Sequence, residues 1–175
     1  MSIDDLNQII DFWINELAHY NFNQLCTKPS SGHWSMGQMY MHLVNDTNYF
    51  VEQMKICVGT NDNMNEEASA NAKKMFFNNS FPDEIIEGAA SNSLISQPGN
   101  KEQLESGLSY LKNEINKVEK IISRTSFKGK TKHPGLNYFT AKEWLQFTGM
   151  HLRHHLKQKK RIDDFLKNNM KLKIE

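Results

Sequence analysis

Apolar side chains recur every three or four residues along most of the chain, which is the periodicity of amphipathic helices. Four stretches carry this pattern: residues 3–25, 36–58, 101–123 and 141–166. Ser35 with Gln38, and Thr140 with Glu143, have the spacing of capping boxes at the starts of the second and fourth stretches. The pattern therefore predicts four long helices, and no internal repeat is visible.

The connections decide how such helices can be arranged. Residues 27–34 are a short turn-rich loop, residues 59–100 are long and rich in Asn and Ser, and residues 124–138 are a basic loop with Gly and Pro. We expect a single all-α domain over residues 1–175, an antiparallel four-helix bundle with a long connection between its second and third helices.

The long connection should not be wholly irregular, because compact bundles rarely hold so long a structureless loop. Short helices are expected around residues 66–78 and 82–89, packed across one end of the bundle. The apolar residues of this region either form an aromatic lid over a pocket or simply cover the core; they are Met75, Phe76, Phe77 and Phe81.

The last helix places two histidines, His151 and His155, one turn apart on the inward face that also holds Trp144 and Ile162. Two imidazoles at this spacing can bind one zinc, nickel or iron(II) ion, although the general-base Glu of HExxH proteins is missing. The alternative is that both are partly buried and hydrogen-bonded to neighbouring groups. His154 points about 100° away from His155 and is left outside the site.

The second helix offers His42 on the flank of its apolar side, followed by Asp46 and Tyr49 along the same line. Inward residues on facing helices build the metal sites of bundles, so His42 becomes a candidate third ligand with His151 and His155. Three roles are open for Asp46: a fourth metal ligand, a group that orients an imidazole, or one member of a surface His–Asp pair. Such a site needs deprotonated imidazoles, so occupancy is expected to fall through the histidine range of about pH 6 to 7.

Composition narrows the possible partners. The net charge of +1 gives no overall attraction to nucleic acid, and Asp163 and Asp164 interrupt the basic run in the last helix. The start of the chain has acids where a signal peptide has basic residues, and no apolar span is long enough for a bilayer, so a cytoplasmic protein without membrane contact is expected. Cys26 and Cys57 lack zinc-type or redox spacing and are expected to be reduced.

The stretches WSMGQMYMHLVND (34–46) and EWLQFTGMHLRHHLKQ (143–158) resemble the DinB/YfiT-like superfamily of metal-dependent four-helix proteins. The resemblance spans nearly the whole chain. It implies a divalent ion held by His42, His151 and His155, and it implies dimers in some relatives. Some relatives are thiol transferases that use bacillithiol, mycothiol or glutathione, and others are hydrolases or isomerases. The resemblance therefore implies the metal site but does not imply a particular reaction.

Two functions from different classes remain. The first is a metal-dependent enzyme, of the thiol-S-transferase or hydrolase type, in which the ion activates a thiol or water for attack on a small electrophile and Asp46 or Tyr49 moves the proton. The second is a non-catalytic stress-response or binding protein with a structural or vestigial metal site. Nucleic-acid binding is a third class, which the near-neutral charge does not favour.

Overall fold

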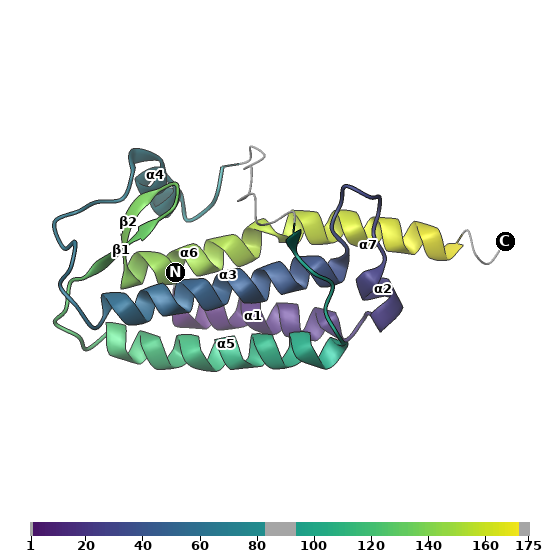
Figure 1. Ribbon diagram of the computed structural model, residues 1–175, viewed down its shortest axis with the longest axis horizontal. Coiled ribbons are helices and arrows are strands. Elements are labelled where there is room, and N and C mark those ends of the chain that lie inside the picture. The colour runs from purple at the N-terminus through teal and green to yellow at the C-terminus, as the bar shows by residue number, and fades with distance from the viewer. Residues whose placement is uncertain (1, 83–93, 172–175) are drawn as a thin grey trace.

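The computed structural model describes residues 2–82 and 94–171, and this part of the chain is mostly helical. Four long helices lie side by side along the long axis (Figure 1): α1 (Ile3–Leu17), α3 (Met36–Cys57), α5 (Lys101–Ile122) and α6 (Ala141–His154). Helix α7 (Leu156–Lys171) continues the line of α6, and the short α2 (Phe22–Cys26) and α4 (Ala70–Asn78) lie toward opposite ends. The prediction of a mainly helical protein is confirmed.

The helices do not all alternate in direction. Helices α3 and α6 are antiparallel, since His42 faces His151 and Phe50 stacks on Trp144. Helices α3 and α5 run the same way, because Val44 packs against Gly107 near their starts and the Thr125 hydroxyl donates to the Val58 carbonyl just beyond their ends, at 3.4 Å. This differs from the expected antiparallel order, and its cause is the long connection that returns the chain to the end where α3 began.

The first predicted helix is divided into α1 and α2. Helix α1 ends at Leu17, and the Asn21 side chain accepts from the backbone N–H of Gln24 while the Gln24 side chain accepts from that of Asn21. This is a capping box, so a new helix starts there. The periodic apolar pattern continues past this capping box, so the sequence analysis predicted one helix instead of two.

The last predicted helix is also divided, at His155. Helix α6 ends at His154, His155 has φ −74° and ψ −8°, and α7 begins at Leu156. The sequence has no proline or glycine at this point, so nothing in the apolar pattern indicated the junction. A candidate ligand therefore occupies the junction between two helices.

A β-hairpin was not expected in the all-α prediction. Strands β1 (Lys130–His133) and β2 (Asn137–Thr140) pair antiparallel, and Asn137 takes a left-handed φ of 65° as β2 begins. Thr131 pairs with Phe139, which is fully buried, and the Thr131 hydroxyl accepts from the Trp144 indole N–H at 2.7 Å. Strands of four residues are too short to give a recognisable period of two, so the sequence suggested only a loop.

The long connection contains the first of its two expected short helices as α4. Residues 83–89 of the second lie outside the described residues. Met75, Phe76 and Phe81 pack partly buried against the core, whereas Phe77 is 90% exposed. Of the four residues, Phe77 alone neither lines the core nor covers it.

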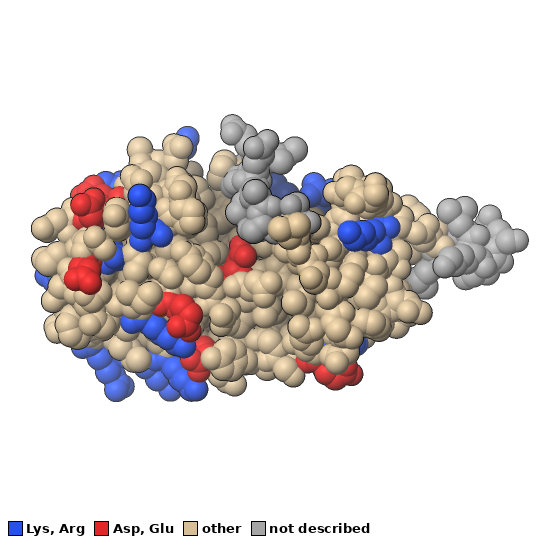
Figure 2. Space-filling view, viewed as in Figure 1, with Lys and Arg blue, Asp and Glu red and all other residues tan. Residues whose placement is uncertain are grey.

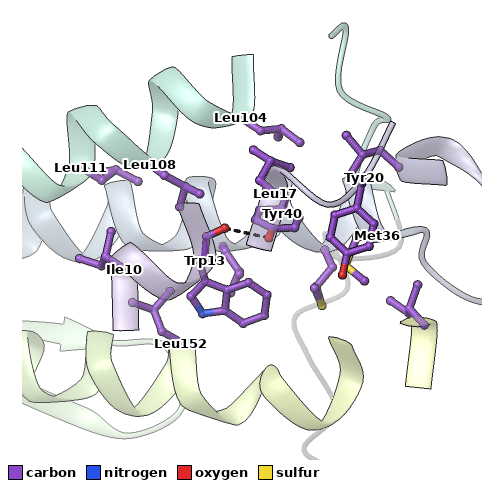
Figure 3. Packing of buried hydrophobic residues seen from close by; sticks show 14 of the residues in the cluster. Ile10, Trp13, Leu17, Tyr20, Met36, Tyr40, Leu104, Leu108, Leu111 and Leu152 are labelled. Carbon is purple, nitrogen blue, oxygen red and sulfur yellow. Dashed lines mark hydrogen bonds between the residues drawn. The ribbon is translucent and has the colours of Figure 1, made fainter. Parts of the chain in front are cut away.

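Two hydrophobic clusters fill the space between the helices. The first joins α1, the start of α3 and α5, where Trp13 and Tyr40 meet edge-on at 5.4 Å and the Tyr40 hydroxyl donates to the Trp13 carbonyl at 2.9 Å (Figure 3). The second is aromatic and lies between the end of α3, the hairpin and α6, with Trp144 at its centre. Both cysteines are free, and Cys57 is buried in the second cluster.

Positive and negative side chains are interspersed over the face shown in Figure 2, in keeping with the small net charge. One of the basic residues of the last helix, Lys159, is 6% exposed and pairs with Glu16 and Asp163, so it does not belong to a basic surface. Lys160 pairs with Asp164. Among the described residues, no helix is both long enough and apolar enough to cross a membrane.

Candidate metal centre

Three histidines meet between α3 and the α6–α7 junction. The Ser35 capping box starts α3 and places His42 on its inward face in the second turn, and the Thr140 capping box does the same for His151 in the last turn of α6. His155 follows at the junction. The three residues are 3%, 6% and 8% exposed, so helix packing buries imidazoles that are 109 and 113 residues apart in sequence.

The three rings present the same atom to one another. The Nε2 atom of His42 lies 3.0 Å from that of His151 and 3.1 Å from that of His155, and the last two are 3.1 Å apart. Within the described ranges, this is a group of His, Cys, Asp or Glu side chains whose ligand atoms are close enough to hold one metal ion. The structure thus brings together His42, His151 and His155, as the sequence analysis expected.

Burial makes these imidazoles neutral. It lowers the pKa of His42 to about 3 and that of His155 to about 4, and it lowers the pKa of His151 well below its ordinary value, with further repulsion between the rings. A neutral imidazole has one N–H and one lone pair, so three Nε2 atoms cannot satisfy one another along all three edges of a triangle. Lone pairs directed at one buried point favour a cation there.

The distances fit that cation. Tetrahedral zinc with Zn–N bonds of about 2.0–2.1 Å separates its ligand nitrogens by about 3.3 Å. The observed separations of 3.0–3.1 Å need only a small outward shift of each ring. Imidazole nitrogens suit zinc, nickel and iron(II) in common, so the donor set fits a divalent ion without selecting among these metals.

The low pKa values revise the expected pH range of binding. The sequence analysis used the ordinary histidine range of about pH 6 to 7. Since the pKa of His42 is about 3 and that of His155 is about 4, protons compete for these nitrogens in the folded protein only at lower pH. Metal occupancy should therefore persist below pH 6.

Asp46 lies at the edge of the centre. Its Oδ1 is 3.4 Å from His42 Nδ1 and its Oδ2 is 3.7 Å from His151 Nε2, while its side chain remains 36% exposed. Burial raises the pKa of Asp46 to about 6. It is close enough to orient His42 or to receive a proton at the centre.

Tyr49 lies farther along α3. It is 41% exposed, its ring contacts Phe50 and Trp144, and burial raises its pKa. Within residues 2–82 and 94–171, no hydrogen bond joins its hydroxyl to the three histidines. A catalytic role for Tyr49 stays a prediction.

Aromatic rings surround the imidazoles. Trp34 lies 5.0 Å from the His42 ring, Phe50 meets His151 edge-on at 5.5 Å, and Phe81 lies 6.3 Å from His151. Phe81 also contacts His154, at 5.1 Å between ring centres, which keeps His154 half-buried beside the centre and outside the converging set. These rings make an apolar wall that limits water around the three nitrogens.

One residue of the site was missed by the sequence analysis. Gln158 lies in the first turn of α7, and its Oε1 is 2.9 Å from His155 Nδ1. The available signal was its position three residues after a candidate ligand, on the same helix face.

The fold and the centre together define a mainly helical protein with three buried histidines that could hold a metal ion. A family model described as the DinB superfamily matches residues 13–158. The match covers most of the chain, so the protein belongs to the DinB superfamily. Neither a search of curated proteins nor a search of solved structures found a match.

Proposed function

We propose that this protein is a metal-dependent enzyme in which His42, His151 and His155 hold one divalent ion: zinc, nickel or iron(II). The observation that supports this most directly is the convergence of three buried Nε2 atoms at 3.0–3.1 Å. A bound ion would supply Lewis acidity, which lowers the pKa of a thiol or a water molecule into the neutral range.

Asp46 is the proposed general base. With a pKa of about 6 its carboxylate is mostly ionised at pH 7, and its Oδ2 lies 3.7 Å from His151 Nε2, so it can accept the proton from the S–H or O–H of the nucleophile. The electron pair left on sulfur or oxygen forms the new bond to the electrophilic carbon, and the leaving group departs with the pair of the broken bond. Tyr49 keeps its proton at neutral pH and is the proposed donor to the leaving group.

The proposed substrates are a small electrophile and either water or a low-molecular-weight thiol. Trp34, Phe50 and Phe81 exclude bulk water from the imidazoles, which favours a nucleophile that enters beside the more exposed Asp46. We place this reaction in the cytoplasm, in one four-helix-bundle domain over residues 1–175 formed by α1, α3, α5 and the α6–α7 line. Pairing of two such chains, as in some relatives, is part of the proposal.

The alternative is a non-catalytic stress-response or binding protein with a structural or vestigial metal site. Exposures of 3–8% for the three histidines favour this alternative, because structural sites are closed to solvent. The 36% exposure of Asp46 favours the enzyme.

The test begins with elemental analysis of protein purified without a histidine tag. Metal-loaded and chelated protein are then assayed with glutathione or bacillithiol and monochlorobimane, and with a panel of ester and amide substrates. We expect stoichiometric metal, turnover that needs it, and a loss of about 10²–10⁴-fold in Asp46→Asn. Stoichiometric metal without turnover of any substrate would favour the alternative with a structural site. Protein that takes up no divalent ion would refute the enzyme and leave only the alternative with a vestigial site.

A further inference from the structure

The three imidazoles of the centre differ in what lies behind them. His155 Nδ1 lies 2.9 Å from the side-chain oxygen of Gln158. His42 Nδ1 lies 3.4 Å from Asp46 Oδ1 without forming a hydrogen bond to it, and within the described residues His151 Nδ1 also has no hydrogen-bond partner. His155 is therefore the ring whose outer nitrogen is held by a specific hydrogen bond.

This contact has one chemical consequence. An amide oxygen has no hydrogen and can only accept, so the proton between these atoms is on His155 Nδ1. Burial keeps His155 neutral, and a neutral imidazole carries one N–H. His155 Nε2, which is 3.1 Å from each of the other two Nε2 atoms, must then present its lone pair to the centre.

The backbone explains why His155 needs such a partner. Within α3 and α6, the regular helix fixes the direction of His42 and His151, whereas His155 lies at the junction where α6 ends. Gln158 is in the first turn of α7, so its hydrogen bond links the orientation of the ring to the helix that follows.

We propose that Gln158 is a positioning residue that fixes His155 in the Nδ1–H tautomer and directs its Nε2 lone pair toward the centre shared with His42 and His151. The proposal rests on the proposed metal function for its purpose, but the tautomer can be measured without metal. Partners of this kind behind a ligating histidine typically contribute about 10–100-fold to metal affinity.

The experiment compares wild-type protein with three variants: Gln158→Leu, Gln158→Glu and Gln53→Leu. Leucine removes the acceptor, and glutamate keeps an acceptor in the same place. Gln53 is half-buried on α3, as Gln158 is on α7, and has no hydrogen bond to the histidines, so Gln53→Leu controls for the same change of side chain.

Imidazole ¹⁵N chemical shifts of the chelated proteins at pH 7 give the tautomer of His155. We expect Nδ1–H in wild type, Gln158→Glu and Gln53→Leu, and a mixture of tautomers in Gln158→Leu. Nε2–H in the wild-type protein would overturn the proposal, as would an unchanged Nδ1–H tautomer in folded Gln158→Leu.

Zinc affinity, measured by competition with a chromogenic chelator, gives the second reading. Gln158→Leu should bind zinc about 10–100-fold more weakly than wild type, while Gln158→Glu and Gln53→Leu should bind at least about as tightly as wild type. If Gln158→Leu binds zinc as tightly as wild type does, Gln158 does not contribute to metal affinity and this part of the proposal is wrong. If wild type shows the expected tautomer but binds no zinc, nickel or iron(II), the proposed function fails while the role of Gln158 in fixing the ring stands.

Discussion

Two buried polar clusters follow each other along the α6–α7 line, and they differ in whether their polar groups find partners within the cluster. Lys159, one turn after His155, has its Nζ 2.6 Å from Glu16 Oε2 and 2.7 Å from Asp163 Oδ2, and the Tyr20 hydroxyl donates a short hydrogen bond to Asp163. Burial opposes the charge of Lys159, yet the hydrogen bonds to Asp163 and Glu16 raise its pKa. This cluster supplies its own counter-charges.

The histidine centre has like atoms facing one another instead. Its three Nε2 atoms converge, and the outer nitrogens of His42 and His151 have no hydrogen-bond partner within the described residues. Buried polar groups are almost always paired, so an incomplete set is informative. The contrast indicates that the lysine cluster holds α7 to α1 with its own ion pairs, while the histidine centre is a group of side chains that could hold a metal ion.

The largest expected effect is the response of the metal-free protein to acid. The folded-state pKa values of the three histidines lie below the unfolded value near 6.5, so the unfolded chain gains protons first and stability falls from about pH 6.5 down to the folded-state values. At about 1.4 kcal/mol per pH unit, His42 and His155 each contribute a loss of about 2 kcal/mol by pH 5, and His151 contributes in the same direction. The measurement is urea unfolding of chelated protein at pH 7, 6 and 5.

Asp46 acts in the opposite sense. Its folded-state pKa of about 6 lies above the ordinary 3.8, so its contribution to stability is present at low pH and lost as pH rises through 6. It should offset part of the histidine loss, and Asp46→Asn should steepen the decline below pH 6. If the free energy of unfolding of the metal-free protein is equal at pH 7 and pH 5, the contrast between the histidine centre and the lysine cluster is wrong.

The next effect concerns the lysine cluster. Lys159→Met leaves the carboxylates of Glu16 and Asp163, which are 27% and 20% exposed, without their cation. Breaking a buried pair typically costs about 3–5 kcal/mol, and we expect about 3 kcal/mol because both carboxylates retain some solvent. Urea unfolding at pH 7 measures it, with zinc binding expected to survive in the folded variant.

Lys160→Met is the matched control for Lys159→Met. Its pair with Asp164 is largely exposed, so the same substitution one residue later should change the free energy of unfolding much less than Lys159→Met does. Equal effects of the two substitutions would mean that the Lys159 cluster is no more than a surface ion pair.

The third effect is the loss of stabilisation by metal. An ion that binds only the folded protein stabilises it by about 2.7 kcal/mol at a hundred times its dissociation constant. Zinc or nickel should raise the melting temperature of wild type at pH 8 and, because the folded-state pKa values are about 3 for His42 and about 4 for His155, still at pH 5. His42→Ala, His151→Ala and His155→Ala should each lose this rise.

His154→Ala is the control for these three variants, since His154 packs against Phe81 beside the centre. It should keep the full rise in melting temperature. A His42→Ala protein that also keeps it would show that α3 contributes no ligand.

The sequence was sufficient for what depends on side-chain period and for the helix starts at the Ser35 and Thr140 capping boxes, but it did not reveal where the first and last predicted helices are interrupted. His42, His151 and His155 could be brought together because each lies on an inward stripe. The junction at His155 has no proline or glycine to mark it, so neither the end of α6 nor the role of Gln158 was foreseen. The hairpin was missed because its strands are four residues long.

Lys159 shows how a local reading of charge fails. The basic run of the last helix, which contains Lys157, Lys159, Lys160, Arg161 and Lys167, has the pattern of a bundle's outer face. Lys159 nevertheless follows His155 by four residues and so shares its buried face. Its partner Asp163 is a further four residues on, a spacing visible in the sequence. The other partner, Glu16, lies on α1, and only tertiary packing brings it there.

The separation of His42 from His151 by 109 residues also sets an order of assembly. A chain synthesised from its N-terminus can form α1 and α3 early, but the pair between α3 and α6 closes a long loop and must wait for the last segment. Ion capture would thus be among the final events of folding, and metal uptake by nascent or truncated chains would report whether the closing helix has docked.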